Sequence, residues 1–470
     1  MSLKKIIQNP GKLVVIFLLV LAIVVGNIFR EKNYASVPLP AENADEYSFA
    51  WLGISLIKNQ YPIAWSGISG YKKHDYQKIN VDNIYDINPN RELFSIDKPW
   101  FDHPPLMGLL IGGYAYLKGV REFADASVII IRRPMLKIAI INTILIFILA
   151  TQLFGKKVGV LSSILYSLIP TIVISSRLAL AENGYIPLFL TSLILAIEYF
   201  KKKKQYLWIL ATVIASIAVL FKMSALAIPL SLILLALFFG GKEKWKLVIF
   251  PVGGIIVSLG LFVLYGAYYD WGTFINVLKA NSNRFFGAGS EIFYSVLTNP
   301  KIIKNYTDGW ITAGLISFLI TTFTGWKKDK NIKYLSIAVF SYFIIFLYFG
   351  SEPYGSYRFP FYPFFIISLS YLLVKLWEEP NILLSLMIFL LPLGTSIHRI
   401  VGIMGFQSLV LYFRLGVLLS LIVFAISSFS DKKISITIQR LFLILIFALL
   451  IFWSIKEIFF VNIDTWYFIT

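Results

Sequence analysis

The chain has 470 residues, of which 58% are hydrophobic and only 14% are charged, and its formal net charge is +18. A soluble domain of this length does not carry so much apolar surface, so the composition excludes the soluble classes and indicates many membrane-spanning helices. The Lys residues gather in short loops between apolar segments, so the positive charge reports topology and does not indicate nucleic acid. With no Cys and only 3 His, the sequence predicts neither disulfides nor a Cys- or His-rich metal site.

Apolar segments of spanning length follow one another from end to end, and we expect one all-α integral membrane domain over residues 1–470 with about thirteen transmembrane helices. The first segment follows a basic N-terminus. It is expected to be a retained span rather than a signal peptide, because no small-residue cleavage site follows it. The expected spans are 13–28, 133–154, 158–176, 183–200, 206–221, 224–240, 247–267, 309–325, 334–349, 359–376, 381–396, 407–428 and 441–460.

Two apolar segments are too long to be single spans. A continuous helix over 158–200 would be about 60 Å long, whereas the hydrocarbon core of a bilayer is about 30 Å thick. We expect it to break in the polar stretch from Ser175 to Gly184. The segment 206–239 is expected to break at Lys222, because a lysine in the middle of a bilayer is costly.

The segment 104–116 has the opposite problem, since about thirteen apolar residues are short for a span. Two prolines open it, as at the start of a helix. If it lies along the membrane surface, all Lys clusters fall on the side of the N-terminus, as the positive-inside rule prefers. We therefore expect a cytoplasmic N-terminus and an external C-terminus in a plasma (inner) membrane. The clusters are at 4–12, 156–157, 201–204, 242–246, 327–333 and 432–433.

This topology predicts a first external loop over residues 29–132, long enough for two or three amphipathic juxtamembrane helices. A second external loop is expected over 268–308, and the spans in 381–470 carry no distinguishing polar pattern. Polar and charged side chains from separate loops then share the external face. They are Asp45, Glu46, Asp102, His103, Arg177, Glu182, Lys222, Glu352, Tyr357 and Arg358.

Mixed acids and bases on one membrane face suit a site that holds a phosphate with cations and removes a proton with a carboxylate. Simpler structural interpretations also stand. Asp45 and Glu46 could simply begin a helix. Arg177 and Glu182 could pair with each other across a turn, and Lys222 could extend to the interface.

At these residues the chain resembles the GT-C membrane glycosyltransferases, closest to the family of protein O-mannosyltransferases and lipid A aminoarabinose transferases (glycosyltransferase family 39-like). The family's Asp-Glu pair after its first span is matched by Asp45-Glu46. Its aromatic-acid-[Lys/His]-Pro-Pro-Leu motif, its Arg-x-Ala-Leu-x-[Asp/Glu] motif, its Lys after the fifth span and its Tyr-Arg-x-x-x-x-Pro stretch are matched in the same order. The matching residues are Phe101 to Leu106, Arg177 to Glu182, Lys222, and Tyr357, Arg358 and Pro363.

The chain departs from the family in two places. His103 stands where some members have Lys, and the Arg that some lipid A modifiers carry near the Asp-Glu pair is missing. The second departure argues against aminoarabinose as the sugar.

The resemblance implies inverting transfer of a sugar from a polyprenyl-phosphate-linked donor to a lipid, glycan or protein acceptor at the extracytoplasmic face. It implies Asp45 as the base that deprotonates the acceptor, with Glu46 and Glu182 in the same catalytic group. It further implies a set of phosphate-binding residues and Asp102 in support. That set is His103, Lys222, Tyr357, Arg358 and Arg177.

Related oligosaccharyltransferases use a divalent metal at such carboxylates, but this sequence shows no clear ligand set, and we predict no metal. The alternative function is a transporter or flippase for sugars or polyprenyl lipids. Transporters keep charges and broken helices near the bilayer midplane. Here the interruptions fall at the ends of spans and the first external loop is long, which favours the transferase.

Overall fold

The computed structural model describes residues 10–40, 43–71, 75–78, 93–282, 309–349, 355–379, 381, 384, 390, 392, 394 and 408–462. Within them, 8 helices are long and apolar enough to cross a membrane, and shorter apolar helices accompany them. The all-α integral membrane class is therefore confirmed, whereas the count of thirteen spans stays a prediction. The expected span 381–396 lies mostly outside the described residues.

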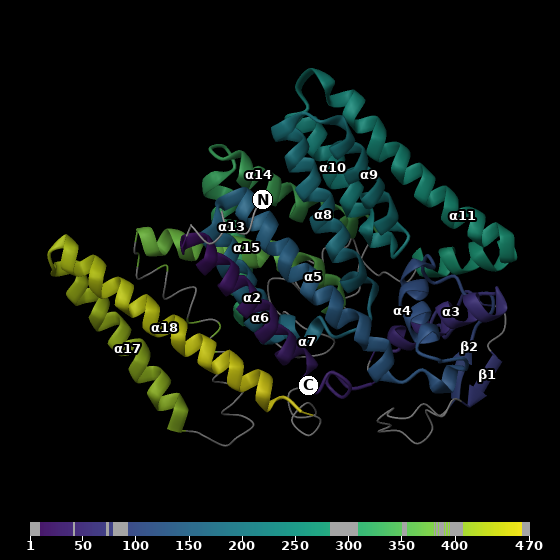
Figure 1. Cartoon of the computed structure of the whole chain (residues 1–470), viewed down its shortest axis with the longest axis horizontal. Helices are drawn as coiled ribbons and strands as arrows, with labels where there is room; N and C mark the ends of the chain where they lie inside the picture. The colour runs from purple at the N-terminus through teal and green to yellow at the C-terminus, as the bar shows by residue number, and fades with distance from the viewer. Residues whose placement is uncertain are drawn as a thin grey trace.

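Figure 1 shows the helices in chain order. They are α2 Pro10–Glu31, α3 Asp45–Asn59, α4 Leu106–Leu117, α5 Val128–Phe154, α6 Lys156–Leu168, α7 Pro170–Ser175, α8 Ala181–Lys202, α9 Gln205–Val219, α10 Ala227–Phe239, α11 Lys244–Ser282, α13 Gly309–Gly325, α14 Lys330–Phe349, α15 Tyr362–Glu378, α17 Ser408–Phe429 and α18 Lys432–Phe460. Short 3-10 turns are η1 Phe123–Asp125, η2 Met223–Leu226, η3 Gly241–Glu243 and η4 Gly355–Phe361.

A small antiparallel hairpin of β1 (Asp75–Lys78) and β2 (Leu93–Ile96) is the element that the sequence did not predict. It lies in the stretch between α3 and α4, where we expected surface helices alone. In Figure 1 the hairpin, α3 and α4 gather at one edge of the molecule.

Both long apolar segments break at the expected polar residues, and the first also breaks at Ile169, before Pro170, inside the expected span 158–176. In the first, α7 ends at Ser175 and α8 begins at Ala181. In the second, α9 ends at Val219, and Lys222 has an extended backbone (φ −164°, ψ 146°) just before η2. These irregular turns leave the polar residues at the ends of helices rather than in their middles.

The helix expected near residues 104–116 is present as α4, and it packs against α3 with the two backbones in contact. A Cβ at Gly53 would lie 2.0 Å from the carbonyl oxygen of Gly108, and one at Gly112 would lie 2.5 Å from that of Ala50. Small residues allow this close approach, as between helices in membranes. The pair thus forms one unit beside α5, and the place of α4 at the membrane surface stays a prediction.

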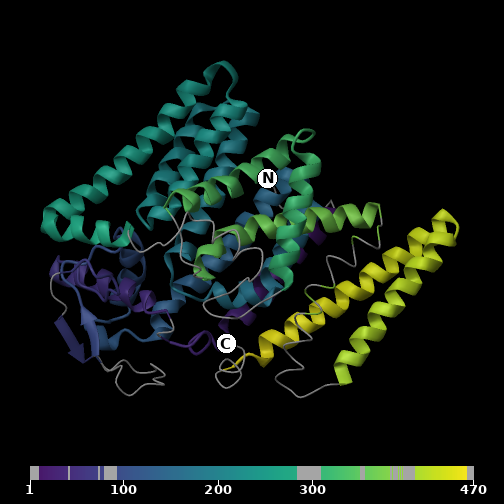
Figure 2. The ribbon, with the colours of Figure 1, turned by 180° about the vertical axis from the view of Figure 1, so that it is seen from behind.

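The hairpin of α17 and α18 diverges from the other helices, as Figures 1 and 2 show from opposite sides. The last part of α18 accepts two hydrogen bonds from the rest of the molecule. Trp310 Nε1 donates to Ser454 Oγ (3.0 Å), and Lys32 Nζ donates to the Phe459 carbonyl (3.2 Å). Many outward side chains of both helices are apolar and exposed, as lipid-facing residues are.

Candidate active site

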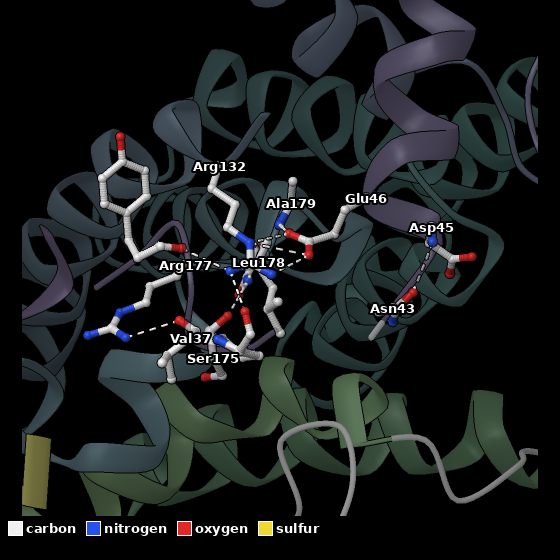
Figure 3. A network of polar contacts seen from close by, with 12 residues as sticks. Val37, Asn43, Asp45, Glu46, Arg132, Ser175, Arg177, Leu178 and Ala179 are labelled. Atoms are coloured by element: carbon white, nitrogen blue, oxygen red, sulfur yellow. Dashed lines mark hydrogen bonds and ion pairs between the residues drawn. The ribbon is translucent and has the colours of Figure 1, made fainter. Parts of the chain in front are cut away.

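Glu46 lies in the first turn of α3 and is fully buried. Arg132 of α5 donates from Nε to Glu46 Oε1 (2.9 Å) and from Nη2 to Oε2 (2.7 Å). The backbone N–H of Ala179 also donates to Oε1 (2.8 Å). Arg132 Nη1 donates to the carbonyls of Tyr34 and Pro38 (2.9 and 2.7 Å). This network, drawn in Figure 3, ties α3, α5, the segment after α2 and the α7–α8 loop together.

Asp45 begins α3, and its side chain points away from this network, as Figure 3 shows. Its backbone N–H donates to Asn43 Oδ1 (3.1 Å). The charge of Asp45 contributes to the raised pKa of Asp102. Asp45 and Glu46 both occupy a helix's first turn, where negative charge is favourable. That structural role is present, but the two side chains face different surroundings.

Glu182 and Lys222 form a buried ion pair across the two helix breaks. Lys222 Nζ lies 2.6 Å from Glu182 Oε1, and it also lies 4.6 Å from the centroid of the Tyr357 ring. The tyrosine comes from η4, so residues from three separate parts of the chain meet at this ammonium group. Glu182 therefore pairs with Lys222, a partner that the sequence did not predict.

A chain of buried hydroxyl groups supports the turn that carries Lys222. The hydroxyl of Tyr185 is hydrogen-bonded to Ser224 Oγ (3.1 Å) and to the hydroxyl of Tyr342 (2.6 Å). These residues come from α8, η2 and α14. They fix the broken helix without adding a further charge.

Asp102 and His103 lie beside the same turn. The backbone N–H of Leu106, at the start of α4, donates to the carbonyl of Leu220 (3.1 Å), which joins this motif to the end of α9. The ring of His103 stacks on Phe49 of α3, with a centroid distance of 5.8 Å and an interplanar angle of 28°. His103 is thus packed against α3, and the motif that carries it is hydrogen-bonded to the end of α9.

The carboxylate of Asp102 accepts hydrogen bonds from Ser66 Oγ (2.6 Å) and Tyr71 Oη (2.7 Å). Tyr71 Oη in turn accepts from the N–H of Phe101 (2.7 Å), which directs its own proton to Asp102. Burial raises the pKa of Asp102 to about 7. The two hydrogen bonds oppose this rise, and the charge of Asp45 adds to it.

Arg177 and Arg358 are both buried, at 1% and 2% exposure. Arg177 donates from Nη1 to the carbonyl of Val37 (3.1 Å) and from Nη2 to that of Phe29 (2.8 Å). It therefore holds the segment after α2 against the α7–α8 loop. Arg358 lies in η4 next to Tyr357. Glu352 lies outside the described residues.

A family model described as dolichyl-phosphate-mannose-protein mannosyltransferase matches residues 102–265, which include Asp102, Glu182 and Lys222. A search of curated protein sequences found no match. Among solved structures, ArnT from Cupriavidus metallidurans bound to undecaprenyl phosphate is similar at a TM-score of 0.54 and 11% identity, over 94% of this chain and 77% of that chain.

The oligosaccharyltransferase AglB from Archaeoglobus fulgidus, in complex with an inhibitory peptide and a dolichol-phosphate, is similar at a TM-score of 0.51 and 10% identity. The match covers 80% of this chain and 52% of that one. The apo form of the archaeal enzyme is similar at a TM-score of 0.52 and 12% identity. The present chain thus spans about half the length of the archaeal enzyme. The present chain has the GT-C glycosyltransferase fold.

Within this GT-C fold, sequence reasoning missed several residues that shape the site. Arg132 is the most prominent, and Ser66, Tyr71, Tyr185 and Tyr342 are the others. A signal for Arg132 was present, because it opens a span on the expected external side, where the positive-inside rule disfavours cations. The hydroxyl residues gave no signal, since Ser and Tyr are frequent near membrane interfaces.

The carboxylates near the candidate site have hydrogen-bond donors around them. Glu46, Glu182 and Asp102 each accept hydrogen bonds from other side chains. Among the described residues, no group of three or more His, Asp or Glu side chains is arranged to hold a metal ion.

Proposed function

We propose that this chain is a membrane glycosyltransferase that moves a sugar from a polyprenyl-phosphate-linked donor to an acceptor, with inversion, at the extracytoplasmic face of the plasma (inner) membrane. The observation that carries the proposal is the meeting of distant motifs of a GT-C fold around Lys222. Its ammonium group pairs with Glu182 and lies against the Tyr357 ring, and the N–H of Leu106 donates to the Leu220 carbonyl just before it. The undecaprenyl phosphate and dolichol-phosphate named in two structures of this fold support a polyprenyl phosphate as the lipid carrier.

In the proposed reaction, Asp45 accepts the proton of the acceptor's hydroxyl or amine. The acceptor then attacks the anomeric carbon, the bond between that carbon and the phosphate oxygen breaks, and polyprenyl phosphate leaves with the electron pair. We assign the base to Asp45 rather than to Glu46, because both Glu46 oxygens already accept hydrogen bonds from Arg132. Glu46 then positions the first turn of α3, and Glu182 orients the acceptor side of the site and Lys222.

The departing phosphate needs positive charge that is already in place when the bond breaks. Lys222 supplies it from a fixed position between Glu182 and the Tyr357 ring. His103, Arg358 and the Tyr357 hydroxyl complete the proposed phosphate site. We place Arg177 in a positioning role, because its Nη1 and Nη2 groups donate to backbone carbonyls and hold the loop that precedes Glu182.

The test is sugar transfer by the purified protein in proteoliposomes, with a set of radiolabelled polyprenyl-phosphate sugars and extracted envelope acceptors. We expect one donor to yield labelled acceptor and free polyprenyl phosphate. Asp45→Asn should abolish transfer, whereas the control Asp125→Asn, in the same external segment, should not. Movement of a labelled lipid across the bilayer without any transfer would instead establish the transporter.

A further inference from the structure

A cluster of cations and tyrosines lies at the C-terminal end of α4, apart from the candidate active site. Lys118 Nζ lies 5.8 Å and Lys137 Nζ lies 5.6 Å from the centroid of one ring, that of Tyr114. Next to them, Arg121 Cζ lies 3.8 Å from the ring centroid of Tyr116. We call these five residues the Tyr114 cluster. All three of its cations are exposed.

Lys137 belongs to α5, which is long and apolar enough to span a membrane. It lies about 14 Å along this helix from Val128, at about 1.5 Å per residue. Helical side chains tilt toward the N-terminus of their helix, so Lys137 extends toward α4 and the near end of α5. Its surroundings are lipid-like, since Leu117 is 85% exposed and Ile141 is 47% exposed. A charged lysine in apolar surroundings is costly unless a partner compensates its charge.

The acids of the neighbouring segments already have partners. Glu122 pairs with Lys58, and Asp125 accepts the backbone N–H of Glu122 (3.3 Å). Arg121 Nη1 donates to the carbonyls of Tyr116 and Val120 (2.6 and 3.0 Å), which are neutral acceptors. The Tyr114 cluster therefore gathers like charges around two aromatic rings, next to the exposed apolar side chains of Leu117 and Ile141. Cation–π contacts orient such groups but do not neutralise them. An anion that approaches from the lipid side would neutralise their charge.

We propose that the Tyr114 cluster binds the phosphate group of an anionic phospholipid in the leaflet that borders α4. Lysine and arginine both donate charge-assisted hydrogen bonds to phosphate oxygens, and arginine does so with two N–H groups at once. The exposed Leu117 and the outer face of α5 would contact the acyl chains. This lipid would hold the α3–α4 unit against the bilayer. The proposal does not depend on the sugar-transfer reaction.

Because the chain contains no Cys, a single label can report on this site. Leu117→Cys, labelled with bimane, would be placed in nanodiscs that contain a trace of acyl-chain nitroxide lipid. The nitroxide lipid is either phosphatidylglycerol or phosphatidylcholine, in a phosphatidylcholine bilayer. We expect phosphatidylglycerol to quench at least about threefold more than phosphatidylcholine, since the three cations attract a headgroup with a net negative charge. Equal quenching by the two lipids would overturn the proposal.

Variants in the labelled background then identify the groups responsible. Lys118→Gln with Lys137→Gln should bring the quenching ratio to about one. Lys156→Gln with Lys157→Gln, the same charge change at the other end of α5, should leave it unchanged. Lys118→Arg with Lys137→Arg should retain the preference. A preference that survives the glutamine pair, or that is lost in the arginine pair, would rule out recognition by these charges.

Discussion

Glu46 and Arg132 form a buried ion pair, with 2.7 Å between Oε2 and Nη2 and side-chain exposures of 1% and 0%. The sequence neighbours of this pair, Asp45 and Arg133, lie outside the buried network. The Asp45 side chain points away from this pair (Figure 3), and Arg133 is 43% exposed with Glu31 at 3.6 Å. The Asp-Glu pair is therefore divided between a carboxylate that is fixed in a buried ion pair and one that lies outside that network.

The two adjacent arginines give a matched test of this division. Arg132→Met leaves Glu46 buried without its cation, which should cost about 3–5 kcal/mol of folding free energy. Arg133→Met removes a half-exposed pair, which should cost about 0–1 kcal/mol. Thermal unfolding in detergent, followed by intrinsic fluorescence, measures both. Equal midpoints for the two variants would contradict the structural role of the Glu46–Arg132 pair.

Asp45→Asn should reduce sugar transfer at least about a hundredfold, because the amide cannot accept the acceptor's proton. Its shape and its place in the first turn of α3 are retained, so the unfolding midpoint and donor binding should stay near those of the parent. Turnover with saturating donor is the measurement. Near-normal turnover would remove Asp45 from the role of base and direct attention to Glu182.

Lys222→Ala should lower donor affinity and turnover, and it should also destabilise the fold by leaving Glu182 buried without its cation. Lys222→Ala with Glu182→Gln should recover much of the stability but not the activity. Arg358→Ala should weaken the donor as well. Its effect and that of Lys222→Ala should be less than additive, because both cations meet one phosphate.

Donor binding by isothermal calorimetry, with unfolding midpoints measured in parallel, separates the two effects of Lys222. A bound polyprenyl phosphate further than about 6 Å from Lys222, Arg358 and His103, which exceeds direct or single-water contact, would refute the assignment.

The raised pKa of Asp102, about 7 against a usual 3.8, predicts a pH dependence of stability. Between these values the folded state holds the proton more tightly than the unfolded state, so stability should fall as pH rises from about 4 to 7. Asp102→Asn should flatten this part of the curve, whereas Asp125→Asn should leave it intact. Unfolding midpoints across that range provide the comparison. An unchanged slope in Asp102→Asn would place the titration elsewhere.

Topology can be read by cysteine labelling in intact cells. A Cys at position 124, within η1, should react with an impermeant maleimide, and one at position 204, between α8 and α9, should not. Position 204 is preferable to Lys203, whose positive φ of 55° disfavours most substitutions. Reaction at 204 and protection at 124 would reverse the orientation and move the candidate site to the cytoplasm.

The sequence by itself determined the membrane class, most helix positions and the places where long apolar segments break. These follow from local properties: the thickness of a bilayer limits apolar length, and a residue such as Lys222 cannot stay in its middle. Motif order also pointed to the GT-C fold. All of these features depend on residues that are close together in the sequence.

Only the tertiary structure decided which charges meet. Glu182 pairs with Lys222, 40 residues away, and Glu46 pairs with Arg132, 86 residues away. Such pairs depend on helix packing and on the course of the loops, which a local pattern does not encode. The same holds for Tyr71 and Ser66, ordinary loop residues until folding brings their hydroxyl groups to Asp102. Asp45 and Glu46 look equivalent in sequence, but successive helical residues point in different directions, and only packing shows which direction leads to the site.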